Sequence, residues 1–201
     1  MLRVELSGNA DTRRALRAFA PDLEKELRTE LRAALSPVVR KARGYVTDDS
    51  PMSGWRGRSF SEAKFPIYNP DTIRRNINYK VTPSKVNENG FSSMASIYNK
   101  SAAGAIYEIA GIKNPQGQPW IGAKSGSSSN KYSKSVNPKA GEQFIKNLPP
   151  IVSSLKGRGR LIYRAWADSR GVAEGAVMRA IDKAIREFYR RAETTTFRRA
   201  A

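Results

Sequence analysis

The apolar residues of the first forty-four positions follow two different periods. Leu2, Val4 and Leu6 alternate with polar side chains, and this two-residue period is typical of a half-buried strand. Further along, apolar residues recur every three or four positions between Arg, Lys and Glu, which predicts an amphipathic helix ending at Gly44. Its regular part is expected to begin at Pro21, because proline suits the first helical position.

The middle of the chain predicts a loop, a hairpin and a short helix. Residues 47–69 are rich in Ser, Gly and Pro and predict a long loop anchored by its aromatic side chains. Residues 73–98 predict a β-hairpin whose turn lies near Asn87 to Gly90. The stretch 102–111, AAGAIYEIAG, has helical spacing and predicts a helix of two or three turns before Gly111.

The last third of the chain begins with a basic segment. Residues 112–159 are rich in Ser, Gly, Lys and Pro and predict a loop or arm within one domain spanning 1–201. Residues 160–166 alternate as a strand would, and the helical period resumes from Val172 to about Arg191. The order of elements predicts an α+β fold, with a small, mainly antiparallel sheet packed by a long N-terminal and a C-terminal helix.

Composition narrows the possible chemistry. The 201 residues include no cysteine and no histidine, which excludes disulfides, thiolate or imidazole metal sites and His-dependent triads. No run of about 18 apolar residues occurs, so we expect no membrane span and a soluble protein that is intracellular when made. Pro21-Asp22 with Glu62-Ala63-Lys64 superficially fits a metal-dependent nuclease, but no strand would hold both acids at one metal. We therefore expect no catalytic residue, no cofactor and no bound metal.

A formal net charge of +18 predicts an acidic partner, either nucleic acid, an acidic protein surface or anionic lipid. Residues 111–170 alone carry eleven Lys and Arg against two acids. The long N-terminal helix lacks the aromatic edge of an interfacial helix, which argues against a membrane surface. Lysines interleaved with aromatic residues could instead bind phosphates and stack on bases, or could form a solvated loop; these candidates are Trp120, Lys124, Lys131, Tyr132, Lys134 and Lys139.

Several short motifs together resemble the tail-component and neck family of long-tailed bacteriophages. The long basic helix is followed by SPMSGWRGRS, in which Pro51, Ser53 and Gly54 precede basic residues. In the helix 102–111 the family's aromatic and acid segment with its following Gly is matched by Ile106, Tyr107, Glu108 and Gly111, and a closing helix has the form RAWADSRGVAEGAVMRAIDKAI. In two places the chain departs from the family: Ala110-Gly111 stands in place of a usual Gly-Thr, and Arg160, Leu161 and Ile162 only loosely match an Arg-Pro-Phe element.

The resemblance implies a non-enzymatic virion protein at the head-tail junction, a tail-completion or tail-terminator subunit. It implies a homo-oligomeric ring that contacts connector or stopper proteins and the tail tube, with possible contact to DNA in the channel. Small residues of the short helix would then allow the backbone of a neighbouring subunit to approach closely, and Glu108 would meet an Arg of the same or the next subunit. The alternative is that these small residues only pack the helix on the hairpin and that Glu108 is a surface acid. The subunit-interface candidates are Ala102, Ala105, Ile106, Tyr107, Glu108 and Gly111. A free nucleic-acid-binding protein that uses the Lys-rich segment is the alternative.

Overall fold

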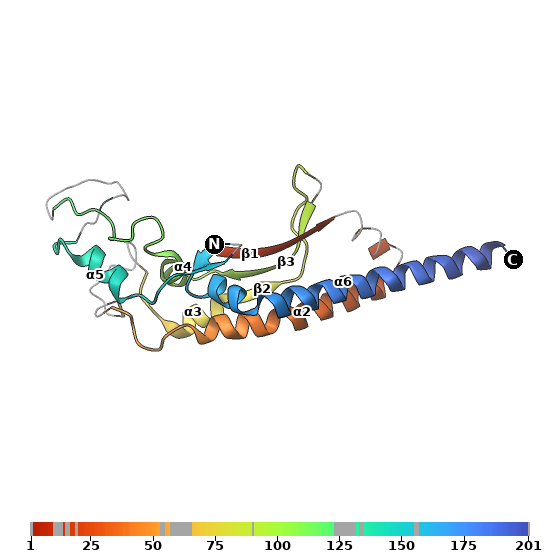
Figure 1. Ribbon diagram of the computed structural model, residues 1–201, viewed down its shortest axis with the longest axis horizontal. Helices are drawn as coiled ribbons and strands as arrows, with labels where there is room; N and C mark the ends of the chain where they lie inside the picture. Colours follow the sequence, from red (N-terminus) through yellow and green to blue (C-terminus); the bar gives the residue numbers. More distant parts are fainter. Residues whose placement is uncertain are drawn as a thin grey trace.

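A computed structural model describes most of the chain: residues 2–9, 14, 17, 18, 20–52, 55, 56, 66–89, 91–122, 132, 135–154 and 157–200. The described residues form an elongated α+β fold, as the sequence predicted (Figure 1). In chain order the elements are β1 (Leu2–Asn9), α2 (Pro21–Gly44), α3 (Pro70–Asn76), β2 (Ile77–Lys80), β3 (Phe91–Asn99), α4 (Ala102–Ile109), α5 (Ala140–Asn147), β4 (Val152–Ser154), β5 (Gly157–Gly159) and α6 (Ile162–Ala200).

The main sheet has three antiparallel strands in the order β1-β3-β2. β2 and β3 form the predicted hairpin, with Ile77 opposite Asn99 and Lys80 opposite Ser96. β1 pairs along the other edge of β3, and its register shifts between Leu6 and Ser7. The strand extends past the alternating residues Leu2, Val4 and Leu6 to include Gly8 and Asn9.

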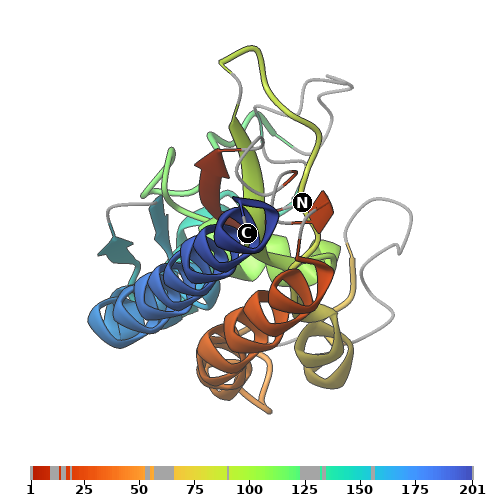
Figure 2. The ribbon, with the colours of Figure 1, turned by 90° about the vertical axis from the view of Figure 1, so that its right-hand side faces the viewer.

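The two long helices lie antiparallel beneath this sheet. Asp168, near the start of α6, lies 3.6 Å from the Lys41 ammonium at the end of α2. At the opposite end the Arg191 guanidinium donates to Asp22 in the first turn of α2 at 2.6 Å. Figure 2 looks along the helices and shows α6, α2 and α3 side by side beneath the strands. The last residues of α6 extend past the start of α2 (Figure 1).

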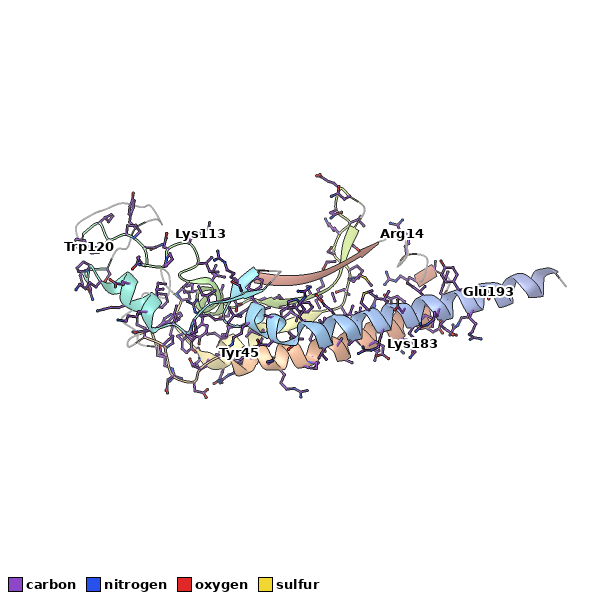
Figure 3. The ribbon with its side chains drawn as sticks, viewed as in Figure 1. Arg14, Tyr45, Lys113, Trp120, Lys183 and Glu193 are labelled. Atoms are coloured by element: carbon purple, nitrogen blue, oxygen red, sulfur yellow. The ribbon has the colours of Figure 1, made fainter. Side chains whose placement is uncertain are left out.

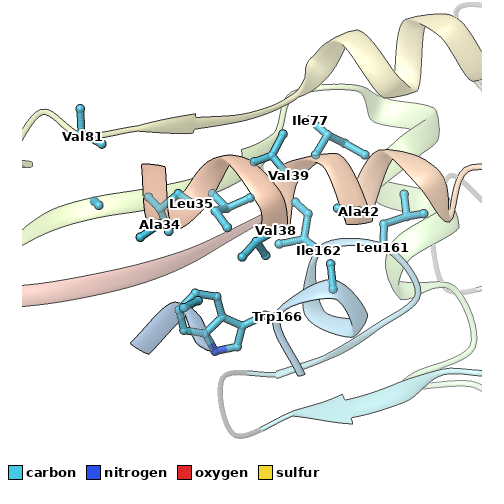
Figure 4. Packing of buried hydrophobic residues seen from close by; sticks show 14 of the residues in the cluster. Ala34, Leu35, Val38, Val39, Ala42, Ile77, Val81, Leu161, Ile162 and Trp166 are labelled. Carbon is cyan, nitrogen blue, oxygen red and sulfur yellow. The ribbon is translucent and has the colours of Figure 1, made fainter. Parts of the chain in front are cut away.

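The core lies between the helix pair and the sheet (Figure 4). The three-to-four spacing of α2 places Leu31, Leu35 and Val38 on its buried side. They pack with Ile77 of β2 and with Trp166 of α6, both almost fully buried. α2 begins at Pro21 and ends at Gly44 as predicted, and it continues through Pro37.

Three local predictions were wrong. Residues 160–166 do not form a strand, because α6 begins at Ile162, ten residues before the predicted start of the C-terminal helix. The apparent alternation hides a helical stripe, in which Leu161, Ile162, Ala165 and Trp166 are all buried. The segment 112–159, predicted as a loop, contains α5, β4 and β5. Residues 73–76, predicted as part of the hairpin, belong to α3, whose cap is Asn69.

A distal lobe lies at the end of the molecule opposite the C-terminus (Figure 1). It is defined here as α5 with the described residues from 112 to 122, at 132 and from 135 to 148. An aromatic cluster joins it to the body. The fully buried Trp55 contacts Phe144 of α5 edge-on, with centroids 5.1 Å apart, and Tyr68 at 5.0 Å. Tyr68 in turn lies 6.0 Å from Tyr107 of α4. Trp55 thus anchors the loop, as predicted, whereas Phe60 and Phe65 lie outside the described residues.

Candidate functional site

The two motifs that carry the family resemblance meet where α4 approaches the start of α6. Glu108 of α4 is fully buried, and its carboxylate accepts three backbone N–H groups from the first residues of α6. Oε2 accepts from Leu161 at 2.8 Å and from Ile162 at 3.0 Å, while Oε1 accepts from Tyr163 at 3.0 Å. The first N–H groups of a helix have no partner inside the helix. Glu108 therefore caps α6 from a position more than fifty residues earlier in the chain.

The sequence around the start of α6 explains why the cap comes from another element. Leu161, immediately before the helix, has no side-chain oxygen that could accept these N–H groups. Gly159 leaves the space that the carboxylate fills, because a Cβ at residue 159 would overlap Glu108 Oε1 and lie 2.8 Å from Cδ. The Glu108 carboxylate thus occupies the space that a side chain at residue 159 would need.

Arg160 closes the site on the other side. Its side chain is almost fully buried, and Nη1 donates to the carbonyl oxygens of Tyr107 at 3.1 Å and Ala110 at 2.8 Å. Nε donates to the carbonyl of Pro149, in the segment that leads from α5 to β4. The Arg160 guanidinium, just before the start of α6, thus holds together the end of α4 and the segment that connects α5 to β4.

Opposing effects act on the charge of Glu108. Burial raises the pKa of its carboxyl above the ordinary value of 4.5, whereas the three N–H donors and the positive charge of Arg160 lower it. Burial also lowers the pKa of the Arg160 guanidinium. The electrostatic effects of Tyr107 and Glu108 act in the opposite direction and raise that pKa. The site has the donors, acceptors and charges of a structural junction that orients α6. The Glu108 carboxylate has no exposed surface on which a substrate could bind.

The interface candidates on α4 fall into two groups. Ala102 is exposed, and Ala105, Ile106 and Gly111 are half-buried, so they remain available for a subunit contact. Tyr107 and Glu108 are fully buried within the chain and leave no surface for a neighbouring subunit. The basic residue beside Glu108 is Arg160 of the same chain, and backbone N–H groups are the direct donors to its carboxylate.

The small residues of α4 also have an intrachain role. A Cβ at Gly104 would overlap the Asn99 amide nitrogen and lie 3.0 Å from Asn99 Cγ. Asn99 is almost fully buried, and its Oδ1 accepts from the Ser101 N–H at 2.8 Å. Gly104 therefore admits the side chain that ends β3, which is the packing alternative left open by the sequence.

The second group of candidates belongs to the distal lobe. Trp120 is 44% exposed, and its indole N–H donates to the Ser135 carbonyl at 3.0 Å, which fixes the ring at the surface. Tyr132 is 39% exposed and Lys139, at the start of α5, is exposed. Lys124, Lys131 and Lys134 lie outside the described residues. The lobe thus presents the aromatic part of the predicted contact surface.

The two acids of the nuclease pattern are not brought together. Asp22 lies in the first turn of α2 and binds Arg191, and that hydrogen bond contributes most to lowering the pKa of its carboxyl. Glu62 lies outside the described residues. Within the part of the chain that the structure describes, no group of three or more carboxylates is placed to hold a metal ion.

Sequence reasoning missed Gly159 and Arg160 as members of this junction. Arg160 was counted as part of the basic segment and as a loose match to an Arg-Pro-Phe element, and Gly159 was given no role. A usable signal was present. No Ser, Thr, Asp or Asn stands directly before the long apolar-periodic helix to cap its first N–H groups, and a Gly-Arg step lies there instead. This pattern predicts that a residue from elsewhere in the fold caps the helix.

Comparison of the chain with protein-family models, with curated proteins and with solved structures finds no match. Across the described residues, no helix has both the length and the apolar composition needed to cross a bilayer. The geometry of the chain itself is therefore the basis for a proposal about its function.

Proposed function

We propose that this protein is a structural virion component of the bacteriophage head-tail junction, a tail-completion or tail-terminator subunit. It assembles as a ring and joins the tail tube to the head connector. It acts by subunit contacts and not by catalysis. During assembly it resides in the host cytoplasm, and afterwards in the virion.

One observation carries this proposal. The helix motif that ends at Gly111 packs against the start of α6, the helix that carries the closing motif of the resemblance, because Glu108 accepts the N–H groups of Leu161 and Ile162. Arg160 to Ile162 match the family's Arg-Pro-Phe element only loosely, and Arg160 also binds the end of α4. Two motifs that share one structural role support a resemblance better than two isolated matches. The α+β fold, with a long helix pair beneath a small antiparallel sheet, is the architecture that the resemblance implies.

Quantitative peptide mass spectrometry of purified extracellular particles tests the proposal. We expect a reproducible copy number of about six or twelve per particle, as a closed cyclic ring requires. The major capsid and tail-tube proteins calibrate the count. Abundant protein in the lysate with none in the particles would refute the assignment.

A free nucleic-acid-binding protein is the second candidate, and the exposed Trp120 and Tyr132 of the lysine-rich distal lobe favour it. A wash in high salt separates the two candidates, because attraction to phosphates weakens steeply with salt. A ring subunit held by shape complementarity stays with the particles, whereas a nucleic-acid binder is released.

A further inference from the structure

The solvent side of the α2 and α6 pair, here called the outer face, has an uneven balance of charges. Cross-helix ion pairs line the seam between the helices. Lys183 of α6 binds Glu26 at 2.5 Å and Glu30 at 3.8 Å, and Asp22 and Asp168 are paired at the two ends. Further acids of these helices bind residues of their own helix: Glu24, Glu174 and Glu187. From residue 21 to 44 and from 162 to 191, only Asp182 has no basic partner among the described residues.

The basic residues of the same two helices are more numerous than these acids can neutralise. Five of them are exposed and form no ion pair with any described residue: Lys25, Arg32, Arg40, Arg179 and Arg186. Against the single unpaired acid, Asp182, they leave four positive charges on the helix pair. The other acids of these helices already form ion pairs with basic residues. The five unpaired basic side chains are therefore available to bind an external anion.

Three of the four arginines, Arg40, Arg179 and Arg186, lie near the seam. Arg32 lies on the side of α2 away from α6, about 200° around the helix from Glu30 and in line with Arg43, which donates to the Ile77 carbonyl. Arg179 and Arg186 lie about one helical turn before and after Lys183, which fixes them beside the first half of α2. Arg40 is next to Lys41, which pairs with Asp168, and Arg32 lies about two turns before Arg40. At 1.5 Å per residue, the arginines of each helix are about 10 to 12 Å apart along the axis.

We infer that the outer face of the α2 and α6 pair binds the phosphate backbone of double-stranded DNA. Four of its five unpaired cations are arginines, whose planar guanidinium suits two phosphate oxygens at once. Two rigid helices hold these groups in fixed positions along a regularly spaced polyanion. The contact is independent of base sequence, because phosphate contacts position a protein without reading bases.

This surface differs from the lysine-rich lobe of the second candidate function. Figure 3 shows Trp120 at one end of the molecule and Lys183 far along the helix pair. The exposed aromatics Trp120 and Tyr132, which suit base stacking, therefore lie away from the arginines. Because Tyr189 of α6 is 63% exposed, the preference for a duplex rests on the fixed positions of the arginines along two rigid helices and not on a lack of aromatic side chains for stacking.

Fluorescence anisotropy with a labelled 20-base-pair duplex tests the inference on the full-length protein. The first variant combines Arg32→Gln, Arg40→Gln, Arg179→Gln and Arg186→Gln. The matched control, here called the lobe variant, removes the same charge from the basic segment 112–159 through Lys124→Gln, Lys131→Gln, Lys134→Gln and Lys139→Gln. Circular dichroism melting establishes that both variants fold.

We expect the arginine variant to lose more than about tenfold in affinity and its salt slope to fall by about 3.6, since each of four phosphate contacts contributes about 0.9. The lobe variant is expected to keep its affinity within about threefold, because it retains the four arginines of the helix pair. Any of four results would overturn the inference. These are equal losses in both variants, loss in the lobe variant alone, binding only to single strands or to an acidic protein, and no binding by the wild type. The particle count is a separate measurement, so the inference and the proposed function can fail independently.

Discussion

Replacing Glu108 by alanine is expected to lower the free energy of unfolding by at least about 3 kcal/mol, since a buried donor left without an acceptor costs about 1 to 3 kcal/mol. Three N–H groups at the start of α6, those of Leu161, Ile162 and Tyr163, lose their acceptor at once. Urea unfolding followed by circular dichroism measures the change. Glu108→Gln should lie between wild type and Glu108→Ala, because one amide oxygen still accepts.

The matched control is Glu174→Ala, which removes a half-exposed carboxylate that binds Arg170 on the same helix. A surface change of this kind is expected to alter stability by no more than about 0.5 kcal/mol. If Glu108→Ala were as stable as Glu174→Ala, Glu108 would not be the cap of α6. Glu108→Lys would place a cation against three N–H donors, so any assembly defect in that variant would follow from loss of the monomer fold.

Replacing Gly159 by alanine is expected to cost about 3 kcal/mol, the upper end of the range for overpacking a tight site. The new Cβ would meet the Glu108 carboxylate and lie 2.8 Å from Tyr163 Cδ2, so either the carboxylate or the start of α6 must move. Displacing the carboxylate also weakens its hydrogen bonds to α6. The same urea titration measures this effect.

Gly171→Ala provides the control, because Gly171 lies within α6 and nothing stands within 4 Å of a Cβ there. Alanine is the better helix former, so this change should stabilise the protein by up to about 1 kcal/mol. In a Glu108→Ala background the clash at residue 159 is largely removed, and Gly159→Ala should then cost much less than in the wild type. Additive effects would show that the two residues do not share one space.

Much of the fold could be predicted because its signals are local. The apolar spacing of α2 and its Pro21 start, the hairpin with its turn near Asn87, and α4 were each read from a few consecutive residues. Leu161 to Trp166 were misread because six residues cannot separate a strand from a helix turn when both sides are apolar. α5 was missed because its apolar side becomes visible only where Phe144 meets Trp55.

The candidate site could be predicted only in part. Glu108 stood out as a single acid in a small-residue helix, and its burial was recognised as requiring a partner. Gly159 and Arg160, which complete the junction, were missed because the residues that they contact on α4 lie about fifty positions away. The local sequence shows only that the start of α6 lacks a cap of its own.

By itself the sequence determined the α+β class, the positive charge and the absence of cysteine and histidine chemistry, since these follow from composition and from short-range periodicity. Only the tertiary structure decided where the charges act. It buried Glu108 against the start of α6, and it used most acids of the helix pair in ion pairs while leaving Arg32, Arg40, Arg179 and Arg186 free of such pairs within the described chain. The physical reason is that burial and charge pairing depend on distances between elements, which the packing of α2 against α6 sets and local sequence does not.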